Sequence, residues 1–298
     1  MSDVFFEQLD MPRPNHYLKI ANLFHGAMTG RMLEGIEVLI QQEKPDWVMV
    51  YGDTNSTLAS ALAAAKSHLP IAHVEAGLRS HNPAMPEEIN RVLTDRVSSL
   101  LLCPTETAVN NLEKEGFPYK AITKLRQQIV NVGDVMFDAV LYYRERALKE
   151  VNLETFGLEH HGYALCTIHR QENTDQVKRI KSILSALQSI AKDLVVVLLL
   201  HPRTKAKISQ YNLESFLENL YLLDPVPYLE MQRLQMSAKF ILTDSGGMQK
   251  EAYFHHVPCI TLRDETEWVE TVEIGWNNLA GTQTTNILEA FQKLVIIE

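Results

Sequence analysis

The chain has 298 residues, enough for two domains, and its 46% apolar and 22% charged residues are typical of a globular protein. A formal net charge of −9 argues against broad binding to nucleic acid or to anionic membranes, so any phosphate must be held locally by backbone amides and a few basic side chains. No apolar run approaches the roughly 20 residues of a membrane span, and the N-terminus lacks a signal-peptide pattern, which together predict a cytoplasmic protein.

Short apolar runs in the first half of the chain predict the strands of a sheet, and helical stretches lie between them. The strands are expected at Trp47–Tyr51, Ile71–Val74, Leu100–Cys103 and Ile129–Val132, with helices at about Ser56–Ser67, Glu87–Ser98 and Glu106–Glu115. This alternation indicates an α/β protein with parallel strands and with helices on both faces of the sheet.

Three acids in this half follow predicted strands or begin a predicted helix. Asp53 follows the first strand, Glu75 follows the second, and Glu87 lies in the first turn of a helix. Helix capping would explain Asp53 without a function, and complementarity to the helix dipole would explain at least one of Glu87 and Glu88. Carboxylates gathered at the carboxyl ends of parallel strands repel one another, however, and we expect this to raise at least one pKa into the range useful for proton transfer.

The second half repeats the alternation, and the charged helical stretch Asp134–Leu158 separates it from the first. Its strands are expected at Tyr163–Thr167, Val195–Leu200, Tyr221–Leu223, Phe240–Leu242 and Cys259–Leu262. We therefore expect two Rossmann-like domains, residues 1–140 and 141–298, that face each other across a cleft.

Basic side chains follow two strands of the second half. His169 and Arg170 come after one strand, and His201 and Arg203 come after the next. A lone histidine is usually structural, but two basic pairs at the ends of neighbouring strands indicate a pocket for a nucleoside diphosphate. The chain has neither a Gly-x-Gly-x-x-Gly turn nor a Walker sequence, which argues against a dinucleotide or triphosphate site.

An Asp-Ser-Gly-Gly sequence at residues 244–247 follows a predicted strand and opens a helix. Such a junction directs backbone N–H groups and the positive end of the helix dipole at one point, which favours a phosphate. Gly246 and Gly247 would let the ligand approach the backbone, and Ser245 would add a hydroxyl. Glu251, one turn further along, would accept from a sugar hydroxyl. The alternative is an ordinary tight turn, but the charges at residues 263–277, after the next strand, favour a ligand site.

Seven segments together resemble the non-hydrolysing UDP-N-acetylglucosamine 2-epimerases. They are YGDTNST (51–57), HVEAGLRS (73–80), PEEINR (86–91), VGD (132–134), HRQEN (169–173), DSGGMQKEA (244–252) and RDETEW (263–268), and they span essentially the whole chain. The resemblance implies a fold of the GT-B type. It also implies an isomerase that inverts C2 of a UDP-amino sugar, UDP-N-acetylglucosamine to UDP-N-acetylmannosamine, by eliminating UDP and adding it back through a 2-acetamidoglucal.

Carried onto this sequence, the family pattern gives roles to the residues described above. Its cleft acids would be Asp53, Glu75 and Glu87, and its catalytic histidine would be His169. The UDP-sugar would be bound by Ser245, Gly246, Gly247 and Glu251, with the basic Arg170 and His201 beside them. Removal of the C2 proton needs a carboxylate base, and loss of UDP needs stabilisation of the developing phosphate charge. Which acid is the base stays open.

The family needs no redox cofactor and no metal, and the cysteines agree with this expectation. Cys103, Cys166 and Cys259 are far apart and lie in or beside apolar runs, so we expect them in the core rather than in a zinc or redox site. The resemblance further implies a homodimer that forms through the first domain. Its substrate class points to the supply of precursors for surface polysaccharides.

The two ends of the chain differ from the family pattern. Family members begin with a strand, a Gly-x-Arg-Pro motif with a nearby lysine, and a Thr-Gly-Gln-His segment, whereas Met1 to Phe6 resemble an internal stretch. The chain also ends within a predicted helix, Ile287–Leu294, before the family's final helix. We therefore expect a fold without the first βα unit and the C-terminal helix, which leaves an inactive UDP-binding fragment as one alternative.

A third difference concerns the substrate. Trp268 stands where the best-known members have arginine, and the surrounding sequence is more similar to the branch that acts on UDP-2,3-diacetamido-2,3-dideoxyglucuronate. This sugar is therefore the alternative to UDP-N-acetylglucosamine as the substrate.

A GT-B glycosyltransferase is a further alternative. It would share the sheets and the UDP site, but would use the acids of the first domain to bind an acceptor.

Overall fold

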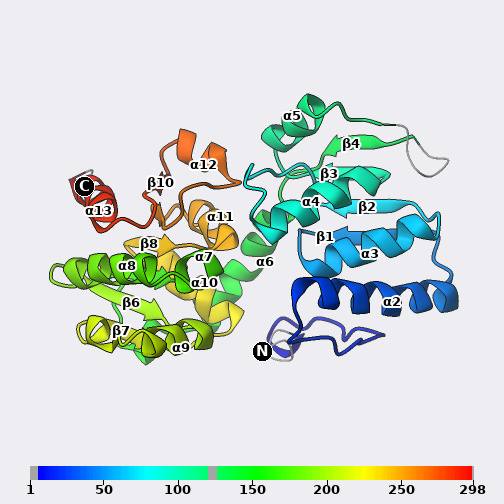
Figure 1. Ribbon diagram of the computed structural model, residues 1–298. Helices are drawn as coiled ribbons and strands as arrows, with labels where there is room; N and C mark the ends of the chain where they lie inside the picture. The colour runs from blue at the N-terminus through cyan, green and yellow to red at the C-terminus, as the bar shows by residue number, and fades with distance from the viewer. Residues whose placement is uncertain (1–5, 120–125, 297–298) are drawn as a thin grey trace. The chain divides into compact units, whose positions relative to one another are not determined.

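The protein contains two parallel β-sheets, each in a unit of its own (Figure 1). The structure is a computed structural model and describes residues 6–119 and 126–296. One unit is Pro14–Val135, called here the N-terminal unit. The other combines Met1–Arg13 with Met136–Glu298 and is called the C-terminal unit. Strands alternate with helices in both, so the expected α/β class with parallel sheets is confirmed.

The N-terminal unit contains a four-stranded sheet in the order β1-β2-β3-β4. Its strands are β1 (Val48–Tyr51), β2 (Ile71–Val74), β3 (Leu100–Cys103) and β4 (Gln128–Asn131). Its helices are α2 (His25–Glu43), α3 (Asn55–Lys66), α4 (Pro86–Val97) and α5 (Glu106–Lys114). The four predicted strands are all present, with ends that differ from the prediction by one residue at most. Helix α2, which the sequence analysis did not predict, packs against α3 (Figure 1).

The C-terminal unit contains a six-stranded sheet in the order β10-β9-β8-β5-β6-β7. Its strands are β5 (Tyr163–Thr167), β6 (Val195–Leu199), β7 (Tyr221–Leu223), β8 (Phe240–Thr243), β9 (Cys259–Thr261) and β10 (Asn277–Leu279). The strand order reverses between β5 and β8, because the chain builds outward from β5 to β7 and then returns to the other side. Ligands in open parallel sheets bind at such a reversal, outside the carboxyl ends of the strands.

Eight helices that begin and end within the described residues, and two short 3₁₀ turns, surround this sheet. They are α6 (Val135–Glu150), α7 (Gln171–Thr174), α8 (Val177–Ile190), α9 (Pro202–Gln210), α10 (Tyr228–Ser237), α11 (Gly246–Phe254), α12 (Val269–Glu273), α13 (Thr284–Ile296) and the turns Leu153–Phe156 and Glu214–Leu217. Side chains of β5 alternate between two hydrophobic clusters: Ala164 and Cys166 face one, whereas Tyr163 and Leu165 face the other. A strand buried on both faces reads as a continuous apolar run, which explains why β5 was predictable.

The first described residues belong to the C-terminal unit rather than to the sheet that follows them in sequence. Tyr143 Oη donates to the carbonyl of Leu9 at 3.1 Å, and Arg146 Nη2 donates to the carbonyl of Gln8 at 3.0 Å. Both donors lie on α6, and the expected domain boundary at residue 140 falls inside this helix. Of the stretch from Met1 to Phe6 that resembles an internal segment, residues 1–5 lie outside the described part of the chain.

Strand β10 was not predicted because Leu279 is its one strongly apolar residue. The strand lies at the edge of the sheet beside β9.

None of the helices in residues 6–119 and 126–296 combines the length and the apolar content needed to cross a membrane.

The burial of the sheet predicts that two leucine-to-alanine substitutions will differ in their effect on the free energy of unfolding. Leu198 of β6 is fully buried, whereas Leu222 of the neighbouring edge strand β7 is 43% exposed. Leu198→Ala should lower the free energy of unfolding by about 3 kcal/mol, because it removes buried apolar atoms and leaves a cavity. Leu222→Ala should cost well under about 1 kcal/mol in the same urea titration. Equal losses would contradict the burial of β6.

Candidate functional site

The turn after β1 holds Asp53 through helix α4. Asp53 Oδ2 lies 2.6 Å from Arg91 Nη2, and the Arg91 side chain is 2% exposed. Asn90, the neighbouring residue on α4, donates its Nδ2–H to the backbone carbonyl of Asp53 at 2.8 Å. The cap of α3 is Thr54, whose Oγ1 accepts from the Thr57 N–H at 3.4 Å. Asp53 is therefore fixed by an ion pair and does not cap the helix.

Glu75 follows β2 in a backbone conformation that is uncommon for a residue with a side chain, with φ at +72°. Its pKa is raised to about 7, first by burial and then by repulsion from Asp53 and Asp134, while Arg91 acts in the opposite direction. The expectation that one acid would have a raised pKa agrees with this result. Loss of water, rather than repulsion, is nevertheless the largest cause.

Asp134 is a functional candidate that the sequence analysis missed. It follows β4 at the same end of the sheet as Glu75, and it adds to the raised pKa of that residue. Its signal was the Val-Gly-Asp segment after a predicted strand.

Glu87 lies in the first turn of α4 and is half-buried. The adjacent Glu88 holds a loop by accepting the N–H groups of Ser80 and His81 at 2.9 and 3.0 Å.

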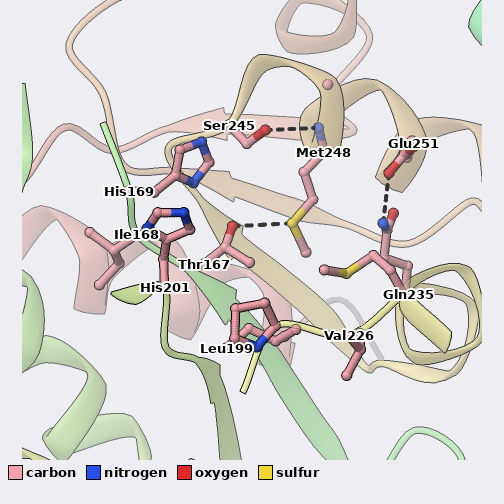
Figure 2. Close-up of a pocket in the computed structure, with 13 residues that line it drawn as sticks. Thr167, Ile168, His169, Leu199, His201, Val226, Gln235, Ser245, Met248 and Glu251 are labelled. Atoms are coloured by element: carbon pink, nitrogen blue, oxygen red, sulfur yellow. Dashed lines mark hydrogen bonds between the residues drawn. The ribbon is translucent and has the colours of Figure 1, made fainter. Parts of the chain in front are cut away.

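A cavity of about 300 Å³ opens in the C-terminal unit at the carboxyl ends of β5, β6 and β8 (Figure 2). Its lining residues are Thr167, Ile168, His169, Leu199, His201, Pro225, Val226, Met231, Gln235, Ser245, Gly247, Met248 and Glu251. The structure therefore brings together the expected catalytic residue His169 and four of the expected UDP-sugar residues, His201, Ser245, Gly247 and Glu251. The expected residues Arg170 and Gly246 are not among those that line it.

A buried carboxylate that the sequence analysis missed fixes the histidine loop. Asp244 is fully buried at the end of β8 and accepts the backbone N–H groups of His169 and Arg170 at 3.0 Å each. Asn173 donates one Nδ2–H to the same carboxylate at 3.0 Å and another to the carbonyl of Leu262 at 3.0 Å. These bonds join the loops after β5, β8 and β9.

The His169 ring lies at the cavity beside His201, with 6.3 Å between the ring centroids (Figure 2). Its pKa is lowered, chiefly by desolvation, with smaller contributions from Arg170 and His201, while Asp244 acts in the opposite direction. A lowered pKa favours the neutral imidazole, which has one N–H to donate and one bare nitrogen to accept. His201 Nδ1 accepts the N–H of Arg203 at 3.2 Å and so caps α9.

The two glycines that open α11 differ in their surroundings. Ser245 Oγ caps the helix by accepting the Met248 N–H at 3.4 Å (Figure 2). A Cβ at Gly247 would meet Met136 Cε at 3.6 Å, an ordinary contact, so this glycine leaves room at the cavity. A Cβ at Gly246 would overlap Glu267 Oε1. At Gly246 the structure differs from the expectation, because a side chain of the protein occupies the space foreseen for a ligand.

Glu251 lines the cavity one turn along α11 and accepts the Gln235 Nε2–H at 2.7 Å (Figure 2). Burial raises its pKa to about 7, and the hydrogen bond from Gln235 acts in the opposite direction. Near neutral pH both protonation states are populated, so Glu251 can accept from a hydroxyl or donate to one.

The charged segment after β9 is mainly paired within the protein. Arg263 is fully buried, with its Nη1 3.0 Å from Glu267 Oε2 and its Nε 3.6 Å from Glu172 Oε1. Lys250 Nζ lies 4.2 Å from the ring centroid of the buried Trp268. These charges pack the loop onto α11, a structural role that their sequence pattern did not distinguish from ligand binding.

The part of the chain that the structure describes contains no group of three or more His, Cys, Asp or Glu side chains arranged to hold a metal ion. The three cysteines are free, and all three are buried, as their apolar surroundings predicted.

Comparisons with known proteins agree on one family. A family model described as UDP-N-acetylglucosamine 2-epimerase matches residues 1–297. A UDP-2,3-diacetamido-2,3-dideoxy-D-glucuronate 2-epimerase of Pseudomonas aeruginosa is 52% identical over 97% of this chain and 79% of its own length. The crystal structure of Methanocaldococcus jannaschii UDP-GlcNAc 2-epimerase in complex with UDP-GlcNAc and UDP matches at a TM-score of 0.92 and 44% identity, over 99% of this chain and 81% of that one.

A more distant match concerns the fold alone. An α,α-trehalose 6-phosphate synthase from Burkholderia multivorans matches at a TM-score of 0.54 and 11% identity, over 100% of this chain and 71% of that one. Together with the epimerase structures, it supports the expected GT-B type of fold.

The glycine pair predicts opposite effects of the same substitution. Gly246→Ala should lower the free energy of unfolding by about 1–3 kcal/mol, because its Cβ must displace Glu267 from buried Arg263. Gly247→Ala should leave stability unchanged or slightly increased, since alanine favours the helix and meets no obstacle. Urea titration of both variants checks this, and an equal loss in the two would refute the packing of Glu267.

The raised pKa of Glu75 predicts a pH-dependent cost in stability. Because its pKa is about 7 in the folded protein and 4.5 ordinarily, folding favours the protonated form. The contribution of Glu75 to the free energy of unfolding should therefore fall as pH rises from about 4.5 to about 7. Glu75→Gln should be more stable than the parent protein by about 2 kcal/mol at pH 8 and by much less at pH 5. Glu113→Gln, at an exposed position of α5, is the control and should show no such trend.

Proposed function

The chain belongs to the UDP-N-acetylglucosamine 2-epimerase family, and on that basis we propose that it inverts C2 of a UDP-N-acetylamino sugar. The cavity beside the amino end of α11 supports this function most directly, together with the lowered pKa of His169 at its wall, which favours the neutral ring. The Methanocaldococcus jannaschii relative crystallised with UDP-GlcNAc and UDP lends further support to a UDP-sugar as the ligand.

In the proposed first step, a carboxylate of the N-terminal unit removes the C2 proton while the bond from C1 to the UDP oxygen breaks. The electron pair of the C2–H bond forms the C1–C2 double bond of a 2-acetamidoglucal, and UDP leaves with the bonding pair. Glu75 is our candidate for the base, because a pKa of about 7 makes it a stronger base than an ordinary carboxylate while leaving it ionised in part at neutral pH. His169 and the amides at the start of α11 would stabilise the departing diphosphate.

In the second step, UDP adds back to C1. A proton adds to C2 on the face opposite to the one from which the first proton was removed. Inversion needs a donor on that face, and Asp53 and Glu87 are the two candidates. The ion pair with Arg91 favours the ionised form of Asp53. Arg170, His201, Ser245, Gly247 and Glu251 would bind the nucleotide and its sugars.

Two substrates fit this chemistry. UDP-N-acetylglucosamine, converted to UDP-N-acetylmannosamine, is the substrate by which the family is described. UDP-2,3-diacetamido-2,3-dideoxyglucuronate is favoured by the 52% identity to the Pseudomonas aeruginosa enzyme that is named for it. A homodimer, a cytoplasmic location and a role in supplying surface-polysaccharide precursors belong to the same proposal.

Exchange of the C2 proton with solvent tests the reaction. We expect proton NMR in D₂O to show loss of the H2 signal of one of the two sugars and the appearance of a manno-type anomeric signal. A released or transferred sugar would instead indicate a glycosyltransferase. UDP binding without exchange of either sugar would indicate a UDP-binding protein and overturn the epimerase.

Substitutions should separate chemistry from binding in this assay. Asp53→Asn, Glu75→Gln and Glu87→Gln should each slow exchange by about 100-fold or more, because each removes a proton-transfer group or its charge. UDP affinity, measured by calorimetry, should change little. Ser245→Ala should weaken UDP binding by about fivefold through one lost hydrogen bond. If every variant lost exchange and binding equally, these assignments would be wrong.

A further inference from the structure

A cluster of four charged side chains, His73, Asp95, Arg79 and Glu115, lies under the acid-bearing turns of the N-terminal unit. His73 of β2 and Asp95 of α4 are fully buried, with 2.7 Å between His73 Nδ1 and Asp95 Oδ1. Arg79 Nη1 lies 2.8 Å from Asp95 Oδ2, and its Nε and Nη2 lie 2.6 and 2.8 Å from the two oxygens of Glu115.

Hydrogen bonding determines the charge of His73. Its Nε2 lies 2.8 Å from the backbone carbonyl of Gly52, which can only accept, so this nitrogen carries a proton. Asp95 Oδ2 accepts from the Gly77 N–H at 3.2 Å and from Arg79 at 2.8 Å, and the charge of Arg79 favours an ionised Asp95, to which His73 Nδ1 then donates. His73 is therefore an imidazolium, and the cluster contains two cations and two anions.

The direction of both pKa shifts agrees with this assignment. Burial lowers the pKa of His73, but the hydrogen bond and charge of Asp95, the Gly52 carbonyl and the charge of Glu75 together raise it above its ordinary value. Burial raises the pKa of Asp95, but His73 and Arg79 together lower it below its ordinary value.

The cluster bonds the backbone on both sides of the candidate acids. Gly52, whose carbonyl accepts from His73, directly precedes Asp53 and has a φ of +62°. A Cβ at Gly52 would lie 3.3 Å from Glu75 Oε2, so the two turns are in close contact. Gly77, whose N–H donates to Asp95, follows Glu75 by two residues. One ionic cluster thus fixes the turn of Asp53 and the turn of Glu75 to each other.

We propose that the imidazolium of His73, held by Asp95, is a positioning residue for proton transfer at C2, because it sets the place of Asp53 relative to Glu75. This inference rests on the proposed function of these acids. His73 contacts the backbone beneath the acids, not the acids' reacting atoms, so its effect is on geometry. A displacement of about 1 Å between reacting groups is enough to slow a reaction by about 100-fold.

The charge of His73 is tested in the full chain labelled with ¹⁵N-histidine. We expect NMR to show two protonated ring nitrogens for His73 between pH 6 and pH 8, with its signals identified by their loss in His73→Leu. A bare ring nitrogen at pH 7 would overturn the charge assigned to His73, and a bare Nε2 would also overturn the positioning role, because it could not donate to the Gly52 carbonyl.

The positioning role is tested by three variants, with kcat for C2 exchange expressed per folded molecule. His73→Leu keeps a buried side chain of similar size but loses both contacts, and should lower kcat by about 100-fold while UDP affinity is unchanged. Asp95→Asn can donate to a neutral His73 and still accept from Gly77 and Arg79. It should therefore retain kcat within about 10-fold, even if His73→Leu fails to fold.

Ile71→Ala is the matched control for loss of stability. Ile71 is fully buried at the start of the same strand and is not among the residues bonded to Gly52 or Asp95, so its variant should be destabilised but retain kcat per folded molecule. Undiminished kcat in His73→Leu, or an equal fall in Ile71→Ala, would overturn the positioning role. Failure of the proposed function would appear differently, as absence of exchange in the unsubstituted protein.

Discussion

The buried carboxylate of Asp244 is the interaction on which the cavity of the C-terminal unit depends. A carboxylate without water is costly unless donors replace the lost hydration, and the backbone N–H groups of His169 and Arg170 and the side chain of Asn173 do so. Because Asp244 directly follows β8 and the histidine loop follows β5, this set of bonds spans the reversal of strand order. It places the His169 ring and the cap residue Ser245 at the same cavity.

Desolvation controls the charge of the candidate groups in both units. Glu75 in the N-terminal unit and Glu251 in the C-terminal unit each have a pKa raised to about 7, and burial is the largest cause in both. His169 responds to the same cause with a lowered pKa. Loss of water disfavours the charged form of every titratable group, so one physical effect gives a stronger carboxylate base and a neutral imidazole.

Full pairing is the other way in which this protein accommodates buried charge. His73, Asp95 and Arg79 are all buried and bond one another, and their charges are balanced by Glu115. The difference from Glu75 is that each member of the cluster has a partner of opposite charge at hydrogen-bond distance. Such pairs remain ionised and orient the backbone around them, whereas a carboxylate that is desolvated among other acids is poised to exchange a proton.

The sequence alone determined the α/β class, nearly all of the strands and the residues that gather at the strand ends, because apolar runs and strand-to-helix turns are local patterns. It missed helix α2, which has no fully buried residue, and the edge strand β10. Tertiary structure decided which charges are used up in contacts within the protein: Glu267 fills the space at Gly246, and Asp244 holds the histidine loop. These roles depend on burial and on partners distant in sequence, and a linear pattern contains neither.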